Sequence, residues 1–296
     1  MNRCTLCPRR CLADRARGER GFCGAGGTVR VARAAPHFWE EPCLVGPGGS
    51  GTVFFSGCNL RCVFCQNRDI RGDDAFGIAI SVERLAEIFG ELAARGVSNI
   101  NLVTPTPWLT QIRAALRLAW ENGLYLPVVY NSSGYESVSS LVTLRGDIRI
   151  YLPDFKYWNP SLAASLSGAA DYPEAARAAL AEMVKQCGPP RFDSDGLMTR
   201  GVIVRHLVLP GQTEDSMQIL DYLHRTYGDD IVISIMSQYT PMPGMTGALA
   251  RPLTEEEYRR VVDFARTIGI TRAYLQEGGA AAESFIPLFD GEGVLP

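Results

Sequence analysis

Short runs of apolar residues recur along the chain, and amphipathic stretches and turn-forming glycines separate them. Each run is almost continuously apolar, which is typical of parallel strands that are buried on both faces. The pattern predicts strands at 53–55, 100–103, 127–130, 148–152, 202–209, 231–236 and, with the weakest pattern, 273–275.

Between these runs, apolar residues three and four positions apart predict helices that each bury one face. One helix is expected to begin near Trp108, and the alanine-rich stretch 171–186 is expected to form another. The readable helix starts are Ser81 and Thr213 as N-caps, Pro173 in a first turn, and Thr254 with Glu257 as a capping box.

Alternating strands and helices predict a parallel sheet with right-handed crossovers. Six or seven such units fit an α/β fold, a partial or full (β/α) barrel, whose chemistry would lie at the carboxyl ends of its strands. Residues 1–45 differ, because they are rich in Cys, Arg and Gly and have little periodic apolar pattern. The glycine-rich run 46–51 is typical of a linker. We therefore expect a small Cys-rich metal-binding extension at 1–45 and a barrel domain at 46–296.

Composition narrows the class of protein. Hydrophobic residues make up 46% of the 296 and charged residues 21%, and the net charge is −3, so nucleic acid and anionic membranes are not expected partners. No stretch approaches the roughly 20 apolar residues that span a bilayer, and the N-terminus lacks the apolar core of a secretory signal. These features predict a cytoplasmic protein, in which nine cysteines favour metal binding over disulfides.

The strand at 53–55 runs directly into three closely spaced cysteines, Cys58, Cys62 and Cys65, in the spacing C-x3-C-x2-C. A cluster of four irons normally takes four thiolates, so three would leave one iron open to another ligand. A zinc site with a distant fourth ligand is the alternative. Phe64 lies inside the run, where it would shield a cluster or act as an ordinary packing aromatic.

With Gly57 before it, Phe64 inside it and Asn67 after it, this run resembles the cluster motif of radical S-adenosylmethionine (SAM) enzymes. The whole chain is similar to the pyruvate formate-lyase-activating-enzyme-like group, and within it to the iron–sulfur branch with an N-terminal cysteine-rich segment. The resemblance implies a barrel of the radical SAM type and a [4Fe–4S] cluster on the three cysteines. It also implies that the open iron binds the methionine portion of SAM, and that one electron, from a flavodoxin- or ferredoxin-type donor, cleaves SAM to methionine and a 5′-deoxyadenosyl radical.

The resemblance also points to cofactor contacts at the strand ends. After the second strand, the family's Gly-Gly-Glu motif binds the methionine amine, but this chain offers Thr104 and Thr106. The two threonines could instead cap the helix near Trp108. After the third strand, Asn131 and Ser133 are candidate hydrogen-bond partners of SAM, and turn formation is the alternative.

After the fourth strand, Asp154 and Lys156 match the family's Asp-x-Lys element. Residues two apart on a strand share a face, so both side chains can point inward. The resemblance assigns Asp154 to a ribose hydroxyl and Lys156 to the methionine carboxylate. An exposed salt bridge is the alternative.

The fifth and sixth strands add further candidates. Arg205 lies in a match to the family's Arg-x-x-x-x-Pro-Gly element, which makes it a candidate for a carboxylate of the cofactor or substrate. His206 should point to the opposite face as a hydrogen-bonded core histidine. Gln238 or Tyr239 would border adenine or the substrate. No residue is singled out as a catalytic acid or base.

A second group of cysteines lies near the N-terminus: Cys4, Cys7, Cys11 and Cys23. Four thiolates close a metal site, so a structural role is natural, and either zinc or an auxiliary Fe–S cluster suits them. Cys43 could replace one ligand, and His37 is a weaker candidate. Cys187 follows a helical segment and is expected to be a plain thiol.

Three functions follow as hypotheses. The first is a radical SAM enzyme that abstracts hydrogen from a protein glycine and so activates a glycyl radical enzyme. The second is the same radical chemistry on a small molecule or on another protein side chain. The third is an iron–sulfur electron-transfer protein that does not cleave SAM.

Overall fold

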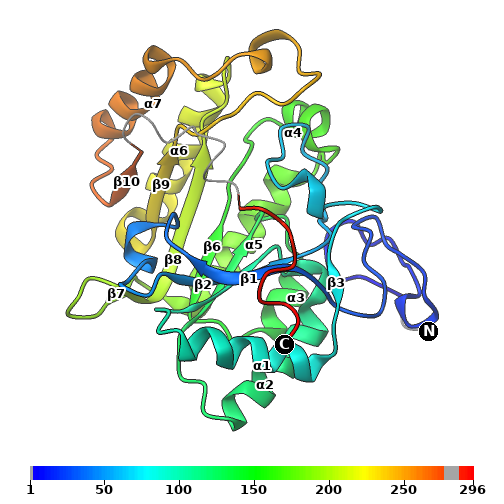
Figure 1. Ribbon diagram of the computed structural model, residues 1–296. Helices are drawn as coiled ribbons and strands as arrows, with labels where there is room; N and C mark the ends of the chain where they lie inside the picture. The colour runs from blue at the N-terminus through cyan, green and yellow to red at the C-terminus, as the bar shows by residue number, and fades with distance from the viewer. Residues whose placement is uncertain (1–2, 277–286) are drawn as a thin grey trace.

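In a computed structural model of the protein, which describes residues 3–276 and 287–296, all the strands expected from the sequence form and run parallel (Figure 1). Their near-continuous apolar sequences fit this, because both faces of the sheet are covered. They are β2 (Ser50–Phe55), β4 (Ile100–Val103), β5 (Val128–Ser132), β6 (Ile150–Pro153), β8 (Met198–Leu207), β9 (Val232–Met236) and β10 (Ala273–Leu275).

The helices form the outer layer and bury one apolar stripe each against the sheet. They are α1 (Val82–Ala94), α2 (Leu109–Glu121), α3 (Val138–Thr143), α4 (Pro160–Ser167), α5 (Tyr172–Cys187), α6 (Thr213–Tyr227) and α7 (Glu255–Thr267), joined in places by the short 3₁₀ turns η1 (Arg15–Arg17), η2 (Pro42–Leu44), η3 (Arg68–Ile70), η4 (Thr106–Trp108), η5 (Gly228–Asp230) and η6 (Gly247–Ala250). In the described part of the chain, none of the helices has both the length and the apolar character needed to cross a membrane.

Three predicted helix starts are confirmed, and Pro173 lies in the first turn of α5. The Ser81 hydroxyl accepts the Arg84 amide at 3.1 Å, and Thr254 with Glu257 forms a reciprocal capping box. The prediction for Thr213 is wrong, because α6 begins at this residue and its hydroxyl accepts a hydrogen bond from Arg260 instead.

The alternative in which threonines cap the helix near Trp108 is also wrong. Helix α2 begins at Leu109, directly after η4, and no side chain caps it.

The sequence pattern missed β1 (Arg30–His37), which pairs antiparallel with β2. Two short antiparallel strands, β3 (Ile78–Ala79) and β7 (Arg191–Phe192), pair with β1 and β8. The strand order is β10-β9-β8-β6-β5-β4-β2-β1-β3, and no pairing among the described residues joins its two ends. The barrel is therefore partial, which settles the choice between a partial and a full barrel.

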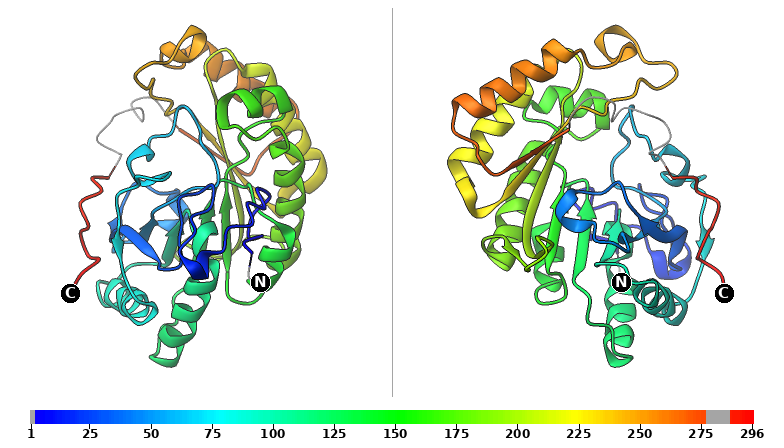
Figure 2. Two further views of the ribbon diagram at one scale, coloured as in Figure 1. Left: turned by 90° about the vertical axis from the view of Figure 1, so that its right-hand side faces the viewer. Right: turned by 60° about the vertical axis from the view of Figure 1, so that its left-hand side comes forward.

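The concave face of the sheet is filled by the segment between β1 and β2. Cys43 and Leu44 of η2 pack there against a layer of inward-facing apolar side chains from four strands: Val129, Ile150, Leu152, Met198, Ile203 and Val232. The right-hand view of Figure 2 shows this blue turn lying across the strands. The segment thus forms a floor for the barrel. The division of the chain at residue 45 stays a prediction.

Candidate active site

The cysteine run leaves β2 through a sharp turn at Gly57. Its φ of +90° is a conformation that favours glycine, and a Cβ added there would come within 2.7 Å of the Cys23 carbonyl oxygen. The Gly57 amide donates to the Ile70 carbonyl at 2.6 Å, and the Trp108 indole donates to the Ser56 carbonyl at 2.7 Å. These contacts fix the start of the loop that carries Cys58, Cys62 and Cys65, which we call the cluster loop (residues 56–67).

The three thiols of the cluster loop lie close to one another. Burial raises the pKa of Cys58 well above its usual range and that of Cys65 to about 11, and the neighbouring thiols add to both shifts. Lys156 opposes these shifts, so its ammonium group faces the loop. The Ser167 hydroxyl donates to the Cys62 sulfur at 3.0 Å.

This donor set fits an iron–sulfur cluster that lacks one protein ligand, because the cysteines share one loop and a cation stands beside them. A bound metal deprotonates its thiol ligands and would reverse the raised pKa values. Among residues 3–276 and 287–296, no three His, Cys, Asp or Glu side chains already have an arrangement that could hold a metal ion.

Aromatic side chains cover the cluster loop. The ring of Phe64 lies 6.4 Å from that of Tyr157 and 6.2 Å from that of Tyr239. The Tyr157 hydroxyl also pairs with that of Ser167, which contacts Cys62. Low polarity around a cluster tunes its reduction potential, so both interpretations of Phe64, as a shield and as a packing aromatic, describe the same contacts.

Asp154, Lys156 and Arg205 form one ion-pair network at the carboxyl ends of β6 and β8. The Asp154 carboxylate accepts from the Lys156 ammonium at 2.7 Å and from the Arg205 guanidinium at 3.0 Å. Burial alone would raise the pKa of Asp154, but the two cations hold it below its usual value. All three side chains are at most 20% exposed. The alternative of an exposed salt bridge is therefore wrong.

Two residues of the network were not anticipated. Glu40, in the segment after β1, accepts from Arg205 at 3.1 Å, from Asn101 at 2.9 Å and from Asn131 at 3.1 Å. Its neighbour Glu41 is 8% exposed. Burial raises the pKa of Glu41 to about 7, although the positive charge of Arg205 opposes this shift. The only sequence signal is a pair of acidic residues within the Cys-rich extension.

The predicted contacts after the third and sixth strands lie beside the cluster loop or the network. The Asn131 amide oxygen accepts from Arg205 at 2.6 Å. The Ser133 hydroxyl donates to the Asn59 side chain at 3.3 Å, and the Gln238 carbonyl accepts from Gln66 at 3.2 Å. Strand ends far apart in sequence therefore converge on the cysteine run.

The two threonines after β4 differ. Thr104 has a φ of +58°, which is unusual for a β-branched residue, and its amide donates to the Asn131 carbonyl at 2.9 Å. The Thr106 hydroxyl donates to Glu136 at 2.7 Å, and the Tyr130 hydroxyl donates to the same carboxylate at 3.2 Å. Burial raises the pKa of Glu136 to about 7. That Thr104 and Thr106 contact SAM stays a prediction.

The prediction that His206 is a core histidine is confirmed. Its Nδ1 donates to the Phe155 carbonyl at 2.7 Å, and burial lowers its pKa to about 4. Cys187 is likewise a plain buried thiol, whose sulfur contacts the Arg149 carbonyl at 3.3 Å. Cys43, considered as an N-terminal metal ligand, lies in the barrel floor instead.

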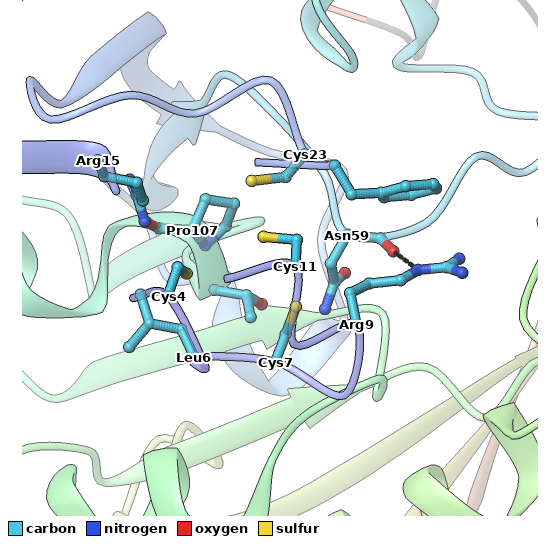
Figure 3. A pocket seen from close by; sticks show the side chains of 11 residues that line it. Cys4, Leu6, Cys7, Arg9, Cys11, Arg15, Cys23, Asn59 and Pro107 are labelled. Atoms are coloured by element: carbon cyan, nitrogen blue, oxygen red, sulfur yellow. Dashed lines mark hydrogen bonds between the residues drawn. The ribbon is translucent and has the colours of Figure 1, made fainter. Parts of the chain in front are cut away.

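The four N-terminal cysteines line one small pocket, together with Asn59 of the cluster loop and with Thr106 and Pro107 after β4. Figure 3 shows the four side chains, Cys4, Cys7, Cys11 and Cys23, gathered around its centre. The pocket thus stands directly beside the candidate cluster.

Comparisons with known proteins agree with this geometry. Residues 52–223 match the radical SAM superfamily. The chain is 31% identical over 283 residues to an uncharacterised protein of Methanocaldococcus jannaschii, and the alignment covers 92% of this chain and 76% of that protein.

Solved structures with the same fold include a radical SAM methyltransferase from Sphaerobacter thermophilus, at 16% identity and a TM-score of 0.53, covering 78% of this chain and 68% of that one. HydG, a maturase of the [FeFe]-hydrogenase, matches at 13% identity and a TM-score of 0.51, and the match covers 77% of this chain and 52% of that one. The protein anSMEcpe with bound AdoMet and the Kp18Cys peptide matches at 12% identity and a TM-score of 0.52. The match covers 74% of this chain and 60% of that one. The chain thus spans little more than half of these last two, and at such identities the likeness concerns the fold.

The match to the radical SAM superfamily covers more than half of the length of this chain. The chain therefore belongs to the radical SAM superfamily, whose members are enzymes.

Proposed function

We propose that the protein holds a [4Fe–4S] cluster on Cys58, Cys62 and Cys65 and cleaves SAM reductively beside it. The observation that carries this proposal is that Lys156, which is ion-paired to Asp154, lies within electrostatic reach of the three thiols of one loop at the carboxyl ends of the strands. When bound, the cluster and SAM supply a 5′-deoxyadenosyl radical after uptake of one electron.

The residues around the cluster loop then bind and orient SAM. Lys156 and Arg205 supply two cations suited to the methionine carboxylate, and Asp154 suits a ribose hydroxyl. Asn131, Ser133, Thr104, Thr106 and Gln238 are the proposed polar contacts around them. The aromatic side chains over the loop limit water, which protects a reactive radical.

For the substrate we propose a protein glycine, so that the enzyme would activate a glycyl radical partner and take its electron from a flavodoxin or ferredoxin. The resemblance of the cluster motif and of the Asp-x-Lys element to activating enzymes supports this. Radical chemistry on a small molecule or on another protein side chain is the alternative. The peptide in the anSMEcpe structure favours protein substrates in general, without selecting glycine.

The test is anaerobic reconstitution with iron and sulfide, followed by addition of SAM and dithionite. We expect methionine and 5′-deoxyadenosine to appear together. An intact cluster without cleavage would instead support an electron-transfer protein. A glycyl radical signal in electron paramagnetic resonance, seen only with a candidate partner and SAM, would identify glycine as the target. Cleavage with no radical on such partners would favour the alternative substrates.

A further inference from the structure

The N-terminal segment 3–29 has almost no regular structure to hold it together. Its one element is the short turn η1, and Arg10 and Leu12 have φ values of +41° and +58°. Such conformations persist only where the surroundings enforce them. All nine cysteines are free thiols, so no disulfide supplies the restraint. A segment with so little core of its own is commonly stabilised by a cross-link, and metals provide one.

Cys4, Cys7, Cys11 and Cys23 line one pocket where such a cross-link would act, and a metal ion would draw their thiols together. The Cys4 amide donates to the Ala13 carbonyl, and the Leu12 amide donates to the Cys4 carbonyl, so the chain folds back on itself around the pocket. A Cβ at Gly21 would lie 2.9 Å from the Cys11 sulfur and 3.7 Å from that of Cys23. Glycine at this position is what lets these two thiols face the same space.

The size of the space suits one of the metals that four thiolates can hold. The pocket that the four cysteines line has room for roughly one water-sized particle. A single ion therefore fits this space. Four thiolates around one ion, with no open position, are typical of structural zinc.

The segment also touches the cluster loop: the Phe22 carbonyl accepts from Arg61 at 3.1 Å, and Arg9 makes a further contact. Arg9, between Cys7 and Cys11, donates to the carbonyl of Asn59 at 3.0 Å and to that of Ser167 at 3.2 Å. Asn59 follows Cys58 directly, and Ser167 donates through its hydroxyl to the Cys62 sulfur. Arg9 therefore contacts the immediate neighbours of two of the three proposed cluster ligands.

We propose that Cys4, Cys7, Cys11 and Cys23 bind one zinc ion, and that this ion, through Arg9, holds the cluster loop in place. The site is separate from the proposed SAM chemistry and needs neither iron nor SAM.

Metal analysis of protein purified without iron reconstitution tests the first half. We expect one zinc per chain, lost in Cys7→Ser and retained in Cys187→Ser, a buried thiol outside the pocket. Replacement by Co²⁺ in the wild-type chain should give the visible absorption of a tetrathiolate site, which needs no variant to fold. Four free thiols with no zinc would overturn the assignment. So would iron–sulfur absorbance that survives in Cys58→Ser but disappears in Cys7→Ser.

Hydrogen exchange in the same iron-free protein tests the second half. Adding zinc to the metal-stripped chain should slow exchange of the Gly57 amide, which bonds to Ile70, by about tenfold, or ~1.4 kcal/mol of local stability. Arg9→Ala should keep the zinc but lose this protection. Arg17→Ala, whose side chain is 86% exposed, is the control and should keep both. Equal protection in Arg9→Ala and wild type would show that Arg9 does not carry the coupling.

Discussion

The guanidinium of Arg205 donates to the Glu40 carboxylate at 3.1 Å, although 165 residues separate them along the chain. Glu40 belongs to the segment that fills the barrel floor, and Arg205 belongs to the network proposed to bind SAM. The contact therefore links the N-terminal part of the chain to the chemistry at the strand ends.

Replacing Glu40 by Gln should weaken both SAM binding and the fold. The change leaves Arg205 paired with Asp154 but removes one of its two carboxylate partners. We expect the Kd for SAM to rise about tenfold, or ~1.4 kcal/mol, with a loss of folding stability of about 1–3 kcal/mol. Titration calorimetry on reconstituted protein and thermal unfolding measure the two effects. Glu87→Gln, at a largely exposed position, is the control and should change neither. Unchanged SAM affinity in Glu40→Gln would remove Glu40 from the positioning of Arg205.

Replacing Cys62 by Ala should abolish both the iron–sulfur absorbance and the cleavage of SAM, because two thiolates cannot retain the cluster. Iron content, visible absorption and 5′-deoxyadenosine yield measure the result. Cys187→Ala also removes a buried thiol, but one that contacts only the protein interior, and should keep cluster and cleavage. A Cys62→Ala protein with full cluster content would contradict the ligand assignment.

The two threonines after β4 should respond in opposite ways. Thr104 holds a left-handed conformation that costs a β-branched residue about 1–3 kcal/mol, so Thr104→Gly should keep or raise the unfolding temperature. Thr106→Val removes the donor to buried Glu136 and should cost about 1–3 kcal/mol. Thermal unfolding measures both, and equal losses would contradict this account. A raised KM for SAM in Thr104→Gly would support its proposed contact with the cofactor.

His206 should make the fold less stable in mild acid. Its folded pKa of about 4 lies below the ordinary value of 6.5, so between these pH values the unfolded chain binds more protons. Stability from this group is present above pH 6.5 and is lost as pH falls toward 4, by at most about 3 kcal/mol. Denaturant titrations of wild type and His206→Gln across this range measure it, because their difference cancels the contributions of Glu41 and Glu136. A difference that does not change with pH would refute the shifted pKa.

The sequence alone was sufficient to predict those parts of the candidate site that depend on local spacing. The run from Cys58 to Cys65 lies on one loop, and Asp154 and Lys156 share a strand face, so their proximity follows from chain geometry. The parallel strands were equally readable, because burial on both faces leaves continuous apolar runs.

Other features depend on contacts between distant segments and leave no periodic signal. Glu40 becomes part of the candidate site only because the segment after β1 folds into the barrel. Strand β1 itself escaped prediction because its exposed and buried positions do not alternate. The ring contacts around Phe64 likewise appear only in the folded chain. The same is true of the pocket that Asn59 lines together with the four N-terminal cysteines.

The edge of β1 has a consequence for the order of events during synthesis. The Ala34 amide donates to the Glu292 carbonyl at 2.8 Å, and the Gly291 amide donates to the Ala32 carbonyl at 3.0 Å. Domains otherwise fold from the N-terminal side as the ribosome delivers them. Here the strand that leads into the barrel floor lacks these bonds until residues 291 and 292 have been translated. The cluster loop follows β2, the partner of β1, so its support is complete only in a chain translated that far.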